Sequence, residues 1–200
     1  MTQIETLFFG SSFDALSRLD VMFIMLAGLP SLLVTAPLAV RFFRNKHAKA
    51  LIRFKIDVKK TIVKIVIISM IYLCVYMLFG YYVAWQFEEL RLFYSGSAEK
   101  LGFLAQMAHN WEENPIIFPF QIIRGALFGL AAIPLLLIIP QDKKSFIISI
   151  CLVYLGTAIG LIIPNVLFPD AVRIAHLIEM STSMLLFGVV VGTVFKNNIN

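Results

Sequence analysis

Residues 61–86, TIVKIVIISMIYLCVYMLFGYYVAWQ, hold one charged side chain, Lys64, in 26 positions. A hydrocarbon layer about 30 Å thick is crossed by about 20 apolar helical residues, so this stretch predicts a membrane-spanning helix. The whole chain of 200 residues is 60% apolar or aromatic and only 14% charged, whereas soluble domains carry roughly 25% charge. One core of a domain this size cannot bury so much apolar surface. The composition therefore excludes a water-soluble fold.

Four further stretches have the length and composition of membrane spans. The five predicted spans are residues 21–40, 61–86, 116–139, 146–168 and 171–195. Asn114-Pro115 and Pro169-Asp170 provide helix-start signals before the third and fifth spans. We therefore expect a single integral membrane domain over residues 1–200, an all-α, polytopic bundle of about five transmembrane helices.

The distribution of lysine and arginine predicts the orientation of these spans. Loop 41–60, between the first two spans, carries eight cations, which are Arg41, Arg44, Lys46, Lys49, Arg53, Lys55, Lys59 and Lys60. Basic loops stay in the cytoplasm. We therefore expect the N-terminus outside, the C-terminus in the cytoplasm, and segment 87–114 on the extracytoplasmic side.

The basic loop also predicts which partners the chain has. Leu51, Phe54 and Val58 recur at helical spacing among its cations, which suits the anionic lipids of the inner leaflet. No folded module with base-reading side chains is present, so we expect no nucleic acid partner. The two cysteines and three histidines lack zinc-site spacing, so neither a metal nor another cofactor is expected.

Two charged side chains lie well inside predicted spans, Arg124 in the third and Glu179 in the fifth. Each is about nine residues from the outer end of its helix, roughly 13 Å deep at 1.5 Å per residue. A charge at this depth is costly and must face protein or water. We therefore expect an Arg124–Glu179 ion pair and contact between these spans. The pair has either a functional role or only an architectural one, as a pin between helices.

Other polar residues are expected near this pair. His176, Glu179 and Ser183 form one helical stripe that runs inward from the outer surface, with Arg173 one turn before it. A carboxylate one turn from an imidazole suits a proton relay or a general base. The predicted outward-facing pocket contains the candidates for ligand binding or proton relay: Arg124, Arg173, His176, Glu179, Ser183, Asn165, Tyr81, Tyr82 and Gln86.

Glycines repeat at a spacing that lets membrane helices pack closely. The pairs are Gly125 and Gly129, Gly156 and Gly160, and Gly188 and Gly192, one pair on each of the last three spans. Small residues four apart allow backbones to approach. They favour a tight three-helix unit, although the same grooves suit another subunit, so a homo-oligomer or a membrane partner chain stays open.

The sequence provides no enzymatic signature. Glu88, Glu89 and Arg91 lack the spacing of intramembrane metal-dependent proteases of the prenyl-protein-processing type, and we interpret them as a solvated rim. No GxSxG serine motif is present. Catalytic residues stay unknown, and we lean against an enzyme.

Several of these residues together resemble a pattern in small, uncharacterised bacterial polytopic integral membrane proteins. They are Trp85-Gln86, Arg124-Gly125, Pro134 and the series Arg173, His176, Glu179, Ser183, Phe187-Gly188. The likeness covers the second to fifth spans. It implies a bacterial cytoplasmic-membrane location, and it implies no activity, substrate or cofactor.

Three functions are compatible with these patterns. The first is binding, or help in transport, of a small anionic or proton-coupled ligand or a lipid headgroup at the Arg/His/Glu site. The alternative is a non-catalytic subunit or assembly factor of a membrane complex. A membrane enzyme acting on a lipid-borne substrate is third.

Overall fold

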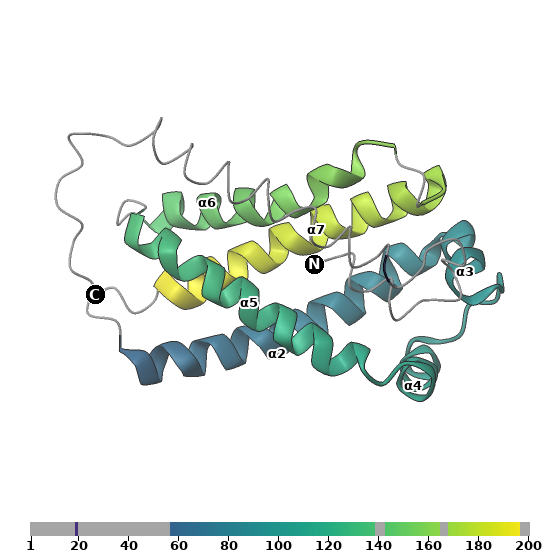
Figure 1. Cartoon of the computed structure of the whole chain (residues 1–200), viewed down its shortest axis with the longest axis horizontal. Helices are drawn as coiled ribbons and strands as arrows, with labels where there is room; N and C mark the ends of the chain where they lie inside the picture. Colours follow the sequence, from purple (N-terminus) through teal and green to yellow (C-terminus); the bar gives the residue numbers. More distant parts are fainter. Residues whose placement is uncertain (1–18, 20–56, 139–142, 165–167, 197–200) are drawn as a thin grey trace. The chain divides into compact units, whose positions relative to one another are not determined.

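The computed structural model describes Leu19 and residues 57–138, 143–164 and 168–196. All of these except Leu19 belong to one compact unit that begins at Ile52. The predicted first span, 21–40, and most of the basic loop 41–60 lie outside the described residues. Within the described part every regular element is helical (Figure 1).

Eight helical segments make up this unit. They are α2 (Val58–Tyr82), η3 (Ala84–Gln86), α3 (Glu88–Ser95), α4 (Phe103–Glu113), α5 (Ile117–Ile138), α6 (Lys143–Leu155), η4 (Gly156–Leu161) and α7 (Asp170–Lys196). Four stretches within the described ranges are long and apolar enough to cross a membrane: Val58–Gln86, Ile117–Leu136, Lys143–Leu161 and Asp170–Phe195. They correspond to the second to fifth predicted spans.

The stretch Lys143–Leu161, which corresponds to the fourth predicted span, ends earlier than the sequence predicts. The predicted span continued to residue 168, but helix α6 tightens into the 3₁₀ segment η4 at Gly156, which ends at Leu161. A 3₁₀ helix rises about 2.0 Å per residue, against 1.5 Å in an α-helix. The residues of η4 therefore extend the stretch farther than the same number of α-helical residues would.

The four long helices form two close pairs, α2 with α5 and α6 with α7, and α2 also packs against α7 (Figure 1). Helices α5 and α7 touch as well, at far fewer positions, so the predicted contact between the third and fifth spans is present. Because α5 packs mainly on α2, the tight unit of the last three spans that the glycine spacing favoured is not formed within the described residues. The more extensive packing is within the two pairs and between α2 and α7.

Three of the six predicted packing glycines lie where the paired helices touch most closely. A Cβ on Gly125 would lie 2.8 Å from the Cα of Ser69 on α2, and a Cβ on Gly188 would lie 2.8 Å from the Cα of Cys151 on α6. A Cβ on Gly192 would lie 3.0 Å from the Cα of Ile147. Gly129 makes ordinary contact with Ile65, whereas Gly156 and Gly160 have no atom within 4 Å of the Cβ position.

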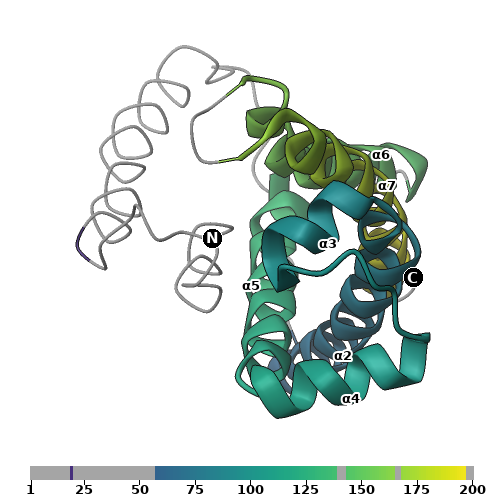
Figure 2. The ribbon, with the colours of Figure 1, turned by 90° about the vertical axis from the view of Figure 1, so that its right-hand side faces the viewer.

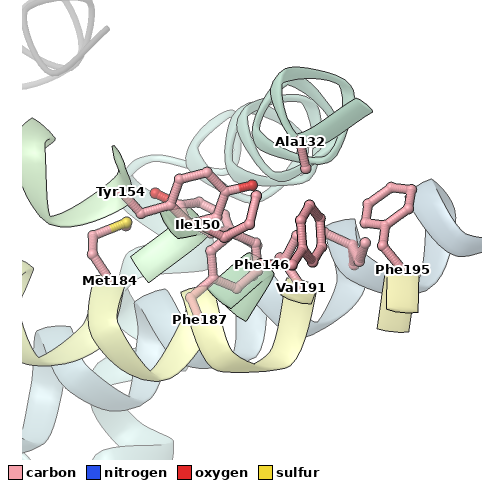
Figure 3. Packing of buried hydrophobic residues seen from close by; sticks show 10 residues of the cluster. Ala132, Phe146, Ile150, Tyr154, Met184, Phe187, Val191 and Phe195 are labelled. Atoms are coloured by element: carbon pink, nitrogen blue, oxygen red, sulfur yellow. The ribbon is translucent and has the colours of Figure 1, made fainter. Parts of the chain in front are cut away.

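The main core contains an aromatic ring from each long helix. The ring of Phe187 on α7 lies 5.0 Å from Tyr72 on α2, 5.6 Å from Tyr154 on α6 and 6.0 Å from Phe128 on α5, between centroids. The Tyr154 hydroxyl donates a 2.6 Å hydrogen bond to the Phe128 carbonyl. Figure 3 shows Tyr154 and Ile150 of α6 facing Phe187 and Val191 of α7.

The outer faces of the long helices stay apolar and exposed. Large apolar side chains between 47% and 62% exposed include Ile62, Ile123, Leu152 and Val189, one from each long helix. Exposed apolar side chains on every long helix suit a bilayer and are unfavourable in water. The exposed surface therefore fits a membrane protein.

We predict that Gly188→Ala destabilises the fold by about 1–3 kcal/mol, because its Cβ overlaps the α6 backbone and α6 and α7 must separate. Gly156→Ala is the matched control, since its Cβ meets open space. Thermal unfolding in detergent, followed by helical circular dichroism, compares the two variants. Equal midpoints would contradict the close packing at Gly188.

Candidate functional site

Four polar side chains follow one another at the end of the bundle that carries α3. The Tyr94 hydroxyl lies 2.9 Å from His176 Nε2, and His176 Nδ1 lies 3.9 Å from Glu179 Oε2. The Ser183 hydroxyl is 3.3 Å from Glu179 Oε1. We call Tyr94, His176, Glu179 and Ser183 the polar row. The stripe expected from spacing on α7 is thus formed by side chains in contact or near contact.

Burial increases along the polar row. The His176 side chain keeps 25% of its surface exposed and the Glu179 side chain 10%, while Ser183 is 1% exposed. An ionisable group buried in a membrane helix is expensive unless neighbouring groups stabilise it. The Ser183 hydroxyl and the imidazole provide that stabilisation for Glu179. The row therefore connects an accessible imidazole to a buried carboxylate.

The geometry also indicates where the imidazole proton lies. A carboxylate beside Nδ1 favours the tautomer that carries its proton there, and Nε2 is then free to accept a hydrogen bond from the Tyr94 hydroxyl. The rings of Tyr94 and Phe168 lie 5.7 and 6.0 Å from the imidazole ring and hold its plane. The Tyr94–His176 and Ser183–Glu179 pairs lie within hydrogen-bond distance, whereas His176 and Glu179 lie at ion-pair distance.

Tyr94 is the member of the row that the sequence analysis missed. It comes from α3, whose first turn carries Glu88 and Glu89 and whose end is Gly96 in the left-handed conformation at φ 68°. Acids at a helix start and glycine just after its end are standard boundary signals. With Leu90 and Tyr94 four residues apart on one face, these signals could have predicted the helix, but not the contact with α7.

Arg91 corrects the prediction of a solvated rim. Glu88 and Glu89 are exposed as expected, but Arg91 is 8% exposed. Its Nε donates to the Ala98 carbonyl at 2.8 Å, and its Nη1 donates to the Trp85 and Gln86 carbonyls at 2.8 and 3.2 Å. Consecutive positions of a helix face different directions. The exposure of the two acids therefore did not predict the position of Arg91, which joins α3 to η3.

Arg173 has protein partners similar to those of Arg91. Its Nε and Nη2 donate to Asp170 Oδ1, and its Nη1 donates to the carbonyls of Leu161 and Ile162 at 2.9 and 3.1 Å. The guanidinium thus joins the start of α7 to the end of η4. Because all three nitrogens already donate to protein oxygens, we place Arg173 in the framework that holds α7.

Tyr81, Tyr82 and Gln86 are built into the connection between α2 and α4. The Tyr81 hydroxyl donates to the Leu101 carbonyl at 2.7 Å, and Tyr82 stacks on Phe103 at 5.5 Å. Gln86 donates to the Tyr81 carbonyl and accepts from Lys100. These contacts shape the end of the bundle that carries α3 and α4. The remaining candidate, Asn165, lies outside the described residues.

Arg124 and Glu179 are both buried, at 4% and 8% exposure. The guanidinium carbon of Arg124 lies 5.8 Å from the centre of the Tyr72 ring, within the range of a cation–π interaction. Tyr72 in turn packs on Phe187, one turn beyond Ser183. Arg124 is therefore connected to the α7 side of the core through Tyr72. Its ion pair with Glu179 stays a prediction.

Comparisons with known proteins do not assign these features to a family. No family model, curated protein or solved structure matches the chain. Within the described part, no three histidine, cysteine, aspartate or glutamate side chains gather closely enough to hold a metal ion. The site must therefore be understood from its own chemistry, and the resemblance to bacterial membrane proteins stays a prediction.

We predict that Arg173→Lys lowers stability by about 1–3 kcal/mol, because an ammonium group cannot reproduce the guanidinium fork and leaves carbonyls at the end of η4 unsatisfied. Asp170→Asn is the control. It weakens a pair whose acid is 76% exposed, so its expected cost is below about 1 kcal/mol. Thermal unfolding of both variants in the same detergent measures the difference. An equal loss would refute the carbonyl contacts as the main contribution.

Proposed function

We propose that the chain is a multi-pass protein of a bacterial inner membrane whose polar row binds, or helps to transport, a small proton-coupled ligand. The observation that carries this proposal is the continuous series from Tyr94 through His176 and Glu179 to Ser183. A buried carboxylate reached through an accessible imidazole is the arrangement used for proton relays inside membranes.

The proposed topology is five spans with the N-terminus outside and the C-terminus in the cytoplasm. Lys64, near the start of α2, donates to the Phe195 carbonyl near the end of α7, so these two ends lie together. Lys59, Lys60 and Lys196 are close to them in sequence, whereas Glu88, Glu89 and Asp170 belong to the end where α3 meets α7. This separation of charge supports an outward-facing polar row.

The geometry favours a proton-coupled ligand over an anion held by arginine. Arg173 already donates to Asp170 and two carbonyls, so capturing an anion there would require breaking those bonds. His176 and Glu179 are the ionisable pair of the polar row, and their polar side-chain contacts are with side chains of that row rather than with backbone carbonyls. A single chain of five spans without an inverted repeat is small for alternating access. We therefore propose that it works as an oligomer or with a partner chain.

We predict that Glu179→Gln lowers ligand occupancy at least tenfold, because losing a charged partner costs about 1.5–3 kcal/mol. Thr182→Val is the matched control. The Thr182 hydroxyl is one residue before Ser183 and donates to the carbonyls of Ile178 and Glu179. This variant therefore removes a neighbouring α7 hydroxyl that is not part of the polar row. Native mass spectrometry of wild type and both variants, extracted with surrounding lipid, measures the retained small molecules.

The proposal would be overturned if Glu179→Gln retained the same ligand as wild type, or if wild type retained none. A stoichiometric second polypeptide without a small molecule would instead favour the subunit alternative. Loss of ligand in Thr182→Val as well would point to a general disturbance of α7 rather than a role for the carboxylate.

A further inference from the structure

Helix α4 lies across the outer ends of α2 and α5 (Figure 2). At its start, Phe103 packs on Tyr81 and Tyr82 at the end of α2, with centroid distances of 5.2 and 5.5 Å. At its end, Trp111 packs on Phe118 at the start of α5, 5.0 Å away. An 11-residue helix is about 16 Å long. Helix α4 therefore bridges two candidate membrane helices at the level where both end.

Three different faces run along α4. One face packs on the protein and includes the buried Gln106, whose amide donates to Asn110 at 2.9 Å. A second face is exposed and polar, with His109 and Glu112 three residues apart. The third is exposed and apolar and consists of Leu104, Ala108 and Trp111, which are four and three residues apart.

The apolar face of α4 is unusually open for its composition. Leu104 is 80% exposed and Trp111 59% exposed. Burying a leucine side chain is favourable, so this arrangement would be unfavourable against water. Two large apolar side chains that follow α4 in the chain are exposed as well, Ile116 and, on α5, Ile123.

We infer that α4 is an interfacial membrane helix, with Leu104, Ala108 and Trp111 inserted among the lipids of the leaflet opposite the basic loop. Around the helix, the protein-facing, apolar and polar faces follow one another. A helix that contacts protein, lipid and water at the same time requires this order. Tryptophan is enriched at this depth, where its ring is amphipathic. The proposal rests on α2 and α5 crossing the membrane and does not depend on the polar row.

The chain has two tryptophans, so Trp85→Phe leaves Trp111 as the single tryptophan, whose fluorescence is then followed. The full-length variant is reconstituted in phosphatidylcholine vesicles with bromine near the headgroups or near the bilayer centre. Bromine near the headgroups should quench Trp111 about twofold more strongly, because interfacial helices bury their apolar face only 5–10 Å deep. If Trp85→Phe fails to fold, the difference between wild type and Trp111→Phe provides the same quantity.

Leu104→Glu and Ala105→Glu form a matched pair on adjacent residues of α4. Leu104 belongs to the apolar face, whereas Ala105 is exposed on the side of His109. A glutamate at 104 should lift the helix and reduce lipid quenching of Trp111, while one at 105 should leave it unchanged. Equal effects would contradict the assignment of faces.

Two other results would overturn the proposal. Quenching by aqueous iodide, without quenching by brominated lipid, would place the face in water. Emission that is insensitive to both quenchers and shifts when the protein is diluted in lipid would place a second copy of the chain on the face.

Discussion

The four-ring cluster around Phe187 is the contact on which the described bundle depends. Tyr72, Phe128, Tyr154 and Phe187 come one each from α2, α5, α6 and α7, and their centroids lie 5.0–6.0 Å apart where they meet. Between membrane helices there is no hydrophobic driving force, because lipid is as apolar as the side chains, so association depends on packing and hydrogen bonding. Interlocked rings and the Tyr154 hydroxyl bond to α5 provide both.

The glycine contacts bring the helices close enough for those rings to meet. The position of Phe187 in the core also fixes the position of the polar row along α7. Gly188 follows Phe187 directly and rests on the α6 backbone, while Gly125 rests on Ser69 and Tyr72 of α2. Ser183 lies one turn from Phe187, so the buried end of the row is fixed by the core. Its accessible end is fixed separately by α3, through Tyr94.

The sequence predicted the helical architecture well because membrane helices are defined by local composition. The positions of the second to fifth spans and the spacing of the α7 stripe followed from the sequence, as did the close helix contacts at Gly125, Gly188 and Gly192, whereas Gly156 and Gly160 meet open space. Contacts between distant segments were harder to predict. Nothing local indicates that Tyr94 reaches across 82 residues to His176, or that Arg91 donates to backbone carbonyls rather than facing water. The same limit explains why the contacts of Arg173 with the end of η4 could not be predicted.

The end of the bundle that carries α3 holds two kinds of charged side chain, namely arginines that donate to backbone carbonyls and the ionisable pair His176 and Glu179. Arg91 and Arg173 each donate to backbone carbonyls where a helix ends, and such carbonyls have no partner within the helix. Guanidinium groups stay charged at any physiological pH, which suits a permanent contact. His176 and Glu179 are groups whose charge can change, and they lie on α7, between the fixed clamp at Arg173 and the aromatic core. A change of protonation there would act on a helix whose two flanking contacts are held in place, so the response would stay local to the polar row and to Tyr94.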